Sequence, residues 1–327
     1  MFEVHPSAPS LRSVHAVMAS VDEDARGVKT VPTGFEPLDT VLEGGLRPRD
    51  LNIIGGAPGQ GKTVMALQWA RNAASHGRTV VYACYDHDHL TLLSRLLLLE
   101  VGDLVEGSPG ASGPTRAAIR DIAMGETSLE EELSNNLLLR AAYTRVQDYG
   151  DRLWFIHASR SETDLEALAE SANHAGPGNL LIVDFLQKVP HPDTNDLSRV
   201  TRITQGLKAI ALEADVAVLA IVASDAAGLN IRRLRMHHLN GAGGIGYEAD
   251  LMMLLNGKFT AVSKKHTSYD LLKVEEHKRR TVLSFEKYRH GPDAIDLEFV
   301  KDFAHYRFQP SGSHVEEALI DEVMFPE

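Results

Sequence analysis

The chain has 327 residues, a formal net charge of -12 and a hydrophobic content of 43%, so it can bury an ordinary globular core. The acidic balance argues against indiscriminate coating of nucleic acid, although a local basic channel remains compatible with it. Cys84 is the only cysteine, which excludes an intrachain disulfide and a cysteine-based zinc site. We expect this residue to be a small buried strand residue in a reducing compartment.

The sequence shows no sign of a membrane partner. No basic segment followed by an apolar one stands near the N-terminus, and apolar runs such as Leu96–Leu99 are too short to span a bilayer. We therefore expect a soluble, cytoplasmic protein.

The first 30 residues form an N-terminal arm with one amphipathic pattern. Apolar side chains recur at helical spacing within LRSVHAVMASVDEDA, at Leu11, Val14, Val17, Met18 and Val21. A lone helix of this size has too little partner surface within its own segment. We expect it to pack on the main body or on a neighbouring subunit.

A phosphate-binding loop is predicted between Leu51 and Ala66. The apolar run Leu51–Ile54 reads as a strand, a glycine-rich turn follows, and helix-forming residues come after it. Glycines let the backbone amides approach phosphate oxygens, the lysine brings a positive charge to the β and γ phosphates, and the threonine hydroxyl can ligate Mg²⁺. The residues expected to bind ATP are Gly56, Ala57, Pro58, Gly59, Gln60, Gly61, Lys62 and Thr63.

Strands and helices alternate through the rest of the domain, which is typical of a doubly wound α/β fold with a mainly parallel sheet. Further strands are predicted in TVVYACYDH, RLWFIHA, NLLIVDFLQ, VAVLAIVAS and residues 249–255. Helices are predicted at 64–74, 89–101, 162–174 and 197–213, with a helical pattern over 115–149 that Thr127 or Ser128 interrupts as a cap.

The pattern changes near the C-terminus. The closely spaced strands LSFEKYR and IDLEFV, separated by HGPDA, predict a β-hairpin. Residues 31–310 are therefore expected to form one ATPase domain, and the acidic residues 311–327 a mobile tail.

Two carboxylates stand at predicted strand ends. Asp184 follows the apolar run LLIV, where an aspartate can support a magnesium ion or simply cap a turn, and the upstream phosphate loop favours the metal. Asp86 ends the neighbouring strand and could orient the attacking water. The cluster Asp86–His89 also has the composition of a metal site, but alternate strand residues diverge, which favours the first reading.

Two groups of cations are candidates for binding phosphates. The stretch NIRRLRMHH, flanked by glycines, offers Arg232, Arg233 and Arg235 for contacts with single-stranded DNA, although it lacks aromatic residues and could be an ordinary solvated loop. Lys287 and Arg289 alternate on the hairpin and point to one face, where they could reach a nucleotide on a neighbouring subunit. Taken alone, they could be ordinary surface charges.

Taken together, these residues resemble the ATPase domain of replicative DnaB-type helicases, a branch of the RecA-like phosphate-loop family, from about residue 32 to residue 308. The likeness rests on TGFEPLDTVLEGGLRPRDLNIIGGAPGQGKT for the entry segment and Walker A loop and on CYDHDHLTLLSRLL for the strand with the catalytic carboxylate. It rests further on LLIVDFLQ for the Walker B strand and on LNGAGGIGYEADLMMLL for the segment before the last core strand. EKYRHGP matches the hairpin that bears the family's lysine and arginine finger, the cations that reach the nucleotide of a neighbouring subunit. The N-terminal helix is similar to the family's linker helix.

The resemblance implies a homo-oligomeric ring, of six subunits, with ATP and Mg²⁺ at the interfaces and single-stranded DNA in the channel. Lys62 and Thr63 would hold phosphate and metal, Asp184 would support the metal, and Asp86 would polarise water. Lys287 and Arg289 would act in trans, as a hydrolase of this kind requires. Arg232, Arg233 and Arg235 fall in the region of a channel loop.

Departures from the family pattern leave an alternative open. The family has glutamate at the position of Asp86 and a glutamine near Ala223, and an arginine and a glutamate where Asn240 and Gly241 stand. Hydrolysis could therefore be weakened, since a shorter carboxylate can sit too far from the water. The alternative is a RecA-like regulatory or scaffolding ATPase that binds protein partners rather than DNA.

Overall fold

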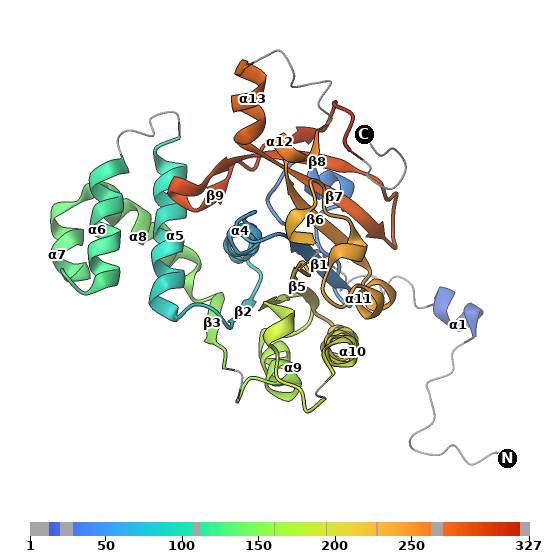
Figure 1. The fold of residues 1–327 in the computed structure, drawn as a ribbon. Helices are drawn as coiled ribbons and strands as arrows, with labels where there is room; N and C mark the ends of the chain where they lie inside the picture. Colours follow the sequence, from blue (N-terminus) through green and yellow to red (C-terminus); the bar gives the residue numbers. More distant parts are fainter. Residues whose placement is uncertain are drawn as a thin grey trace.

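The computed structural model describes residues 13–19, 29–106, 112–159, 161–193, 195–226, 228–262 and 271–320. Within them a single large sheet carries helices on both faces (Figure 1). The parallel strands follow the order β3-β2-β4-β5-β1-β6 and are β1 (Leu51–Gly56), β2 (Val80–Cys84), β3 (Leu153–His157), β4 (Leu180–Asp184), β5 (Ala217–Ala223) and β6 (Leu251–Gly257). The antiparallel strands are β7 (Arg280–Tyr288), β8 (Asp296–Asp302), β9 (Arg307–Phe308) and β10 (Ser313–His314).

Burial on both faces explains the apolar sequences of the central strands. Every residue of β1, β2 and β4 is buried, as expected for parallel strands covered by helices on either side. Cys84 closes β2 and is fully buried, so the expectation of a buried strand residue is confirmed. The alternation of strands and helices predicted from the sequence is confirmed as a doubly wound, mainly parallel α/β sheet.

The helices divide between the two faces of the sheet and a separate lobe. Their bounds are α1 (Val14–Ala19), α3 (Leu38–Val41), α4 (Lys62–Ser75), α5 (His89–Leu104), α6 (Gly113–Met124), α7 (Leu129–Asn135), α8 (Leu137–Gly150), α9 (Leu165–Ala175), α10 (Asp196–Ala214), α11 (Ala242–Glu248), α12 (Lys258–Ala261) and α13 (Leu271–Lys278). Helix α4 covers one face with Met65 and Trp69, while α9 and α10 cover the other with Leu168 and Leu207.

Helices α5 to α8 gather beyond β3 on one side of the molecule (Figure 1) and enclose their own small apolar core. The predicted cap at Ser128 is present, because its side chain accepts a hydrogen bond from the amide of Glu131. A further break at Asn136, whose backbone is extended, ends α7 and caps α8. The helical pattern over 115–149 is thus divided among three helices.

The C-terminal hairpin is confirmed as β7 and β8, but the expectation of a mobile tail from residue 311 is wrong for the described residues up to 320. Strand β10 pairs with β8, and Leu319 bridges to Val262. Ile320 is buried, and Glu317 lies 2.8 Å from the ammonium of Lys258. This segment therefore closes the edge of the sheet, while residues 321–327 lie outside the described residues.

The described part of the N-terminal arm includes a helix, α1, which confirms helical structure within the predicted pattern. None of its six residues is buried. The remaining apolar positions of that pattern, Leu11 and Val21, lie outside the described residues. Among the helices that the structure describes, none is both long and apolar enough to span a bilayer.

Candidate nucleotide site

The phosphate loop joins β1 to α4 at the carboxyl edge of the sheet. Its turn uses Gly59 and Gly61, whose φ angles of 77° and 92° lie in the left-handed region that glycine adopts readily. At Gly61 space also excludes a side chain, because a Cβ atom would lie 2.7 Å from a ring carbon of Phe308. Gly61 is the N-cap of α4 and no side chain caps this end, which suits an anion.

Lys62 lies folded over the loop. Its Nζ donates to the carbonyl oxygens of Gly56, at 2.7 Å, and Ala57, at 3.0 Å. Burial lowers the pKa of Lys62 to about 8, and the nearby carboxylate of Asp184 opposes this change. The ammonium is therefore poorly solvated. Within the described part of the chain its hydrogen-bond partners are two backbone carbonyls, and an incoming phosphate would be a stronger partner.

Asp184 and Thr63 meet where β4 ends beside the loop. The Asp184 side chain is almost fully buried and accepts hydrogen bonds from the Tyr82 hydroxyl, at 2.8 Å, and from the Thr63 hydroxyl. Burial raises the pKa of Asp184, while Tyr82, Thr63 and the charge of Lys62 lower it. A hydroxyl oxygen and a carboxylate oxygen, in contact beside a phosphate loop, are the kind of oxygen ligands that Mg²⁺ prefers.

A pocket of about 280 Å³ opens beside the loop. It is lined by Gly59, Gly61, Lys62, Thr63, Val64, Phe303 and Tyr306. The two aromatic residues come from the turn between β8 and β9, which includes the 3₁₀ helix η6 (Phe303–His305). The sequence reasoning missed Phe303 and Tyr306, because more than two hundred positions separate them from the loop that they complete.

Arg95 is a second residue that the sequence reasoning missed. It projects from α5 so that its guanidinium carbon lies 4.4 Å from the ring centroid of Tyr306. Its Nη1 is buried and, among the described residues, has no hydrogen-bond partner. A lone arginine on the otherwise apolar stretch LLSRLLLL was the available signal. An unsatisfied cationic donor behind this pocket fits an anionic ligand.

Asp86 lies at the same edge, just beyond β2, but does not stand free. Its carboxylate forms an ion pair with Lys188, at the end of the 3₁₀ helix η2 (Leu186–Lys188) that follows β4. Asp88, two residues further, caps α5 by accepting from the amide of Thr91 at 2.8 Å. The structure therefore brings Asp86 to the loop edge together with a cation that no sequence pattern predicted.

The end of β5 lacks a polar side chain at Ala223, yet an amide group is present there. The Gln187 side chain donates to the carbonyl of Ala223 and accepts from its amide, both at 3.3 Å, and also donates to the carbonyl of Asn240 at 3.4 Å. Gln187 thus links the ends of β4 and β5 beside the nucleotide site. Its hydrogen bonds hold these strand ends together.

Arg289 and Lys287 lie near the amino ends of the central parallel strands, whereas the phosphate loop lies at their carboxyl ends. The guanidinium of Arg289 lies 2.7 Å from the buried Asp250 carboxylate, which also binds the ammonium of Lys208 at 2.6 Å. Lys287 donates to the carbonyl of Gly246 at 2.9 Å. Asp250 immediately precedes β6, whereas the phosphate loop follows the far end of β1.

The three arginines predicted to contact DNA do not share one environment. Arg233 pairs with Asp296 at 3.0 Å with only 11% of its side chain exposed, and Arg235 pairs with the buried Glu286 at 2.7 Å. Arg232 is partly exposed. Two of the three guanidinium groups are thus held by carboxylates of the C-terminal hairpin.

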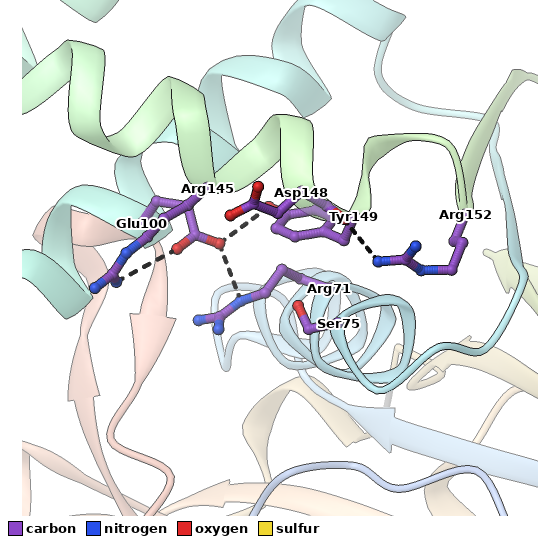
Figure 2. Close-up of a pocket in the computed structure, with 7 residues that line it drawn as sticks. All are labelled: Arg71, Ser75, Glu100, Arg145, Asp148, Tyr149 and Arg152. Atoms are coloured by element: carbon purple, nitrogen blue, oxygen red, sulfur yellow. Dashed lines mark hydrogen bonds and ion pairs between the residues drawn. The ribbon is translucent and has the colours of Figure 1, made fainter.

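A further cavity, of about 300 Å³, lies between α4, α5 and α8 (Figure 2). Its centre is the buried Glu100 carboxylate, which accepts from the Tyr149 hydroxyl at 3.0 Å and lies 3.4 Å from Arg71 and 3.8 Å from Arg145. The Arg152 guanidinium donates to backbone carbonyls. Because these cations have partners, the cavity joins the loop helix to the lobe and is a poor phosphate site.

Comparison with known sequences agrees with this geometry. The model of the DnaB-like helicase C terminal domain family matches residues 30–308. The replicative DNA helicase DnaB of Treponema pallidum is 24% identical over 288 residues, which are 84% of this chain and 55% of that protein. The replicative DNA helicase DnaC of Bacillus subtilis is 25% identical over 294 residues, 86% of this chain and 58% of that protein. The chain spans about half the length of the curated relatives it matches.

Solved structures show the same fold. A DnaB-like replicative helicase superposes with a TM-score of 0.68 at 16% identity, covering 91% of this chain and 68% of that one. A KaiC-like protein from Pyrococcus horikoshii superposes with a TM-score of 0.54 at 12% identity, over 88% of this chain and 99% of that one. The resemblance noted in the sequence is confirmed: the chain belongs to the DnaB-like helicase C-terminal domain family.

Proposed function

We propose that this chain binds ATP with Mg²⁺ and hydrolyses it in a cytoplasmic ring of identical subunits, six in number, that acts on single-stranded DNA. One observation carries the proposal. The phosphate loop lies at the carboxyl ends of the parallel strands, and the pair Lys287 and Arg289 lies at their amino ends. A nucleotide can therefore contact both only between two subunits. Head-to-tail contacts of this kind generate rings when the rotation between subunits closes.

The nucleotide would be held by the loop edge of one subunit. Lys62 would exchange its two carbonyl partners for phosphate oxygens, and the amino end of α4 would face the same charge. Thr63 and Asp184 are the groups that would hold Mg²⁺, which neutralises phosphate charge when bound. Phe303 and Tyr306 would form the apolar wall of the pocket.

The chemistry would be shared by two subunits. Asp86 would accept a hydrogen bond from the attacking water and draw its proton away. Arg289 of the adjacent subunit would stabilise the charge that develops on the transferred phosphoryl oxygens, with Lys287 beside it. Asp250 and Lys208 hold the base of that arginine in a fixed place.

The proposed contact with DNA is drawn from the relatives, which are named as replicative DNA helicases. The segment with Arg232, Arg233 and Arg235 would lie along the channel, where Arg233, paired with Asp296, would position the segment rather than contact a phosphate, and Glu286 would fix the position of Arg235. The family match favours this function over a scaffolding ATPase that binds only proteins.

Two measurements test the proposal. Phosphate release should require Lys62 and should rise when single-stranded DNA is added. Binding of fluorescent single-stranded DNA should weaken steeply with salt, because phosphate contacts release counterions. If DNA binding is insensitive to salt and the rate of phosphate release is the same with and without DNA, the scaffolding alternative is supported instead.

A further inference from the structure

Lys188 stands where two strand ends meet. Strands β2 and β4 are neighbours with Cys84 level with Asp184, so the residues that follow each strand emerge side by side. The ammonium of Lys188 forms an ion pair with Asp86 and lies 4.9 Å from the ring centroid of Phe185. Both charged side chains keep some contact with solvent, at 21% exposed for Lys188 and 35% for Asp86.

This ion pair opposes the role proposed for Asp86. A carboxylate that polarises water needs a free lone pair and a high electron density on its oxygens. A neighbouring ammonium occupies one acceptor position of the carboxylate and attracts its negative charge. The pair therefore leaves Asp86 fewer free lone pairs to accept a hydrogen bond from the attacking water.

We propose that Lys188 is a brake on turnover within its own subunit: it withholds Asp86 from water, and hydrolysis requires this ion pair to separate. The inference rests on the proposed role of Asp86 in hydrolysis. Separation is feasible because the pair is partly exposed, and exposed ion pairs are individually weak. The opposite role, in which Lys188 itself stabilises phosphoryl charge, predicts the opposite effect of removing the charge.

The test is phosphate release by Lys188→Met, which keeps an unbranched apolar side chain over Phe185 and removes the charge. Turnover at saturating ATP should rise about two- to fivefold, the limit that a partly exposed ion pair can impose. ATP affinity should stay unchanged. Lys188→Arg keeps the positive charge, so its turnover should remain below that of Lys188→Met. A lower or unchanged turnover of Lys188→Met would overturn the proposal.

Lys278 offers a matched control on a remote helix. Its ammonium lies 2.7 Å from Glu275 and 5.7 Å from the ring centroid of Phe259, so it has the same two kinds of partner. Lys278→Met should leave turnover unchanged. An equal rise in this variant would show that the effect of removing a lysine charge is not local to Asp86, and would also overturn the proposal.

A second measurement separates this inference from the proposed hydrolysis. Acylation of lysines by acetic anhydride in the nucleotide-free protein, read by mass spectrometry, should be faster at Lys188 in Asp86→Asn than in the unaltered chain. Equal labelling would overturn the ion pair itself, whatever the turnover. If the unaltered chain and Lys188→Met both bind ATP and release no phosphate, the proposed hydrolysis and the brake fall together. Turnover in both at one rate refutes only the brake.

Discussion

Removing the Arg289 side chain should stop turnover without unfolding the subunit. Asn52 of β1 is level with Leu251, and Leu251 with Tyr288, whereas Gly56 stands four positions further along β1. At about 3.3 Å per residue, the Arg289 end of β7 and the phosphate loop are separated by at least about 13 Å within one subunit. Arg289 therefore cannot serve its own nucleotide, and its loss should act only at the interface.

The size of the effect follows from the two roles of this residue. An arginine that stabilises phosphoryl charge contributes on the order of 10³-fold to turnover, so Arg289→Ala should lose about that factor. Its structural cost should be about 1 to 3 kcal/mol, because Lys208 at 2.6 Å and the Leu51 amide at 2.8 Å still contact Oδ2 of Asp250, whereas the buried Oδ1 loses Arg289. ATP binding should remain. Arg120→Ala, on the remote α6, is the matched control and should change nothing.

A mixing assay tests directly whether Arg289 acts on the nucleotide of the adjacent subunit. In rings assembled from equal amounts of Arg289→Ala and Lys62→Ala, about one quarter of the interfaces join an intact loop to an intact finger. Phosphate release should recover to about one quarter of the unaltered rate if the interfaces act independently, although each variant alone is inactive. Full turnover by Arg289→Ala alone, or no recovery in rings that light scattering shows to be mixed, would refute action in trans.

Other variants report on single features of the site. ATP affinity should fall as pH rises through about 8, because Lys62 then loses its charge, and binding near that pH should take up a proton, which calorimetry in buffers of different ionisation enthalpy would detect. Gly61→Ala should destabilise the fold by roughly 2 kcal/mol more than Gly77→Ala in urea titrations, since both have positive φ but a Cβ meets atoms within 4 Å only at Gly61. Arg233→Ala should lower the stability to urea through the loss of Asp296 as a partner, with little change in the salt dependence of DNA binding.

Local patterns in the sequence were sufficient to predict the sheet and the strand, turn and helix of the expected phosphate loop. The order of Gly61, Lys62 and Thr63 after an apolar run specifies a strand, a turn and a helix, because each residue type has a local conformational or chemical reason to be there. The same holds for the hairpin, where turn residues separate two alternating stretches. Structure confirmed these elements without changing their order.

What the sequence could not provide were contacts between distant segments. Phe303 and Tyr306 reach the loop only because β8 and β9 turn back over α4, and no local pattern records that path. Lys188 meets Asp86 because β2 and β4 are adjacent in the sheet although they are far apart in the chain. The tail was misjudged for the same reason, since Glu317 pairs with the distant Lys258.

That closing segment bears on where the domain can safely be cut. The family match ends at residue 308, but a chain truncated there would bare the backbone amides and carbonyls of β8. It would also remove Glu317, one of the two carboxylates that pair with Lys258, whose exposed fraction is only 4%. The apolar surface that Ile320 covers would become exposed to solvent. An open strand edge invites pairing with other chains, so such a fragment should aggregate where the chain extended to residue 320 stays dispersed.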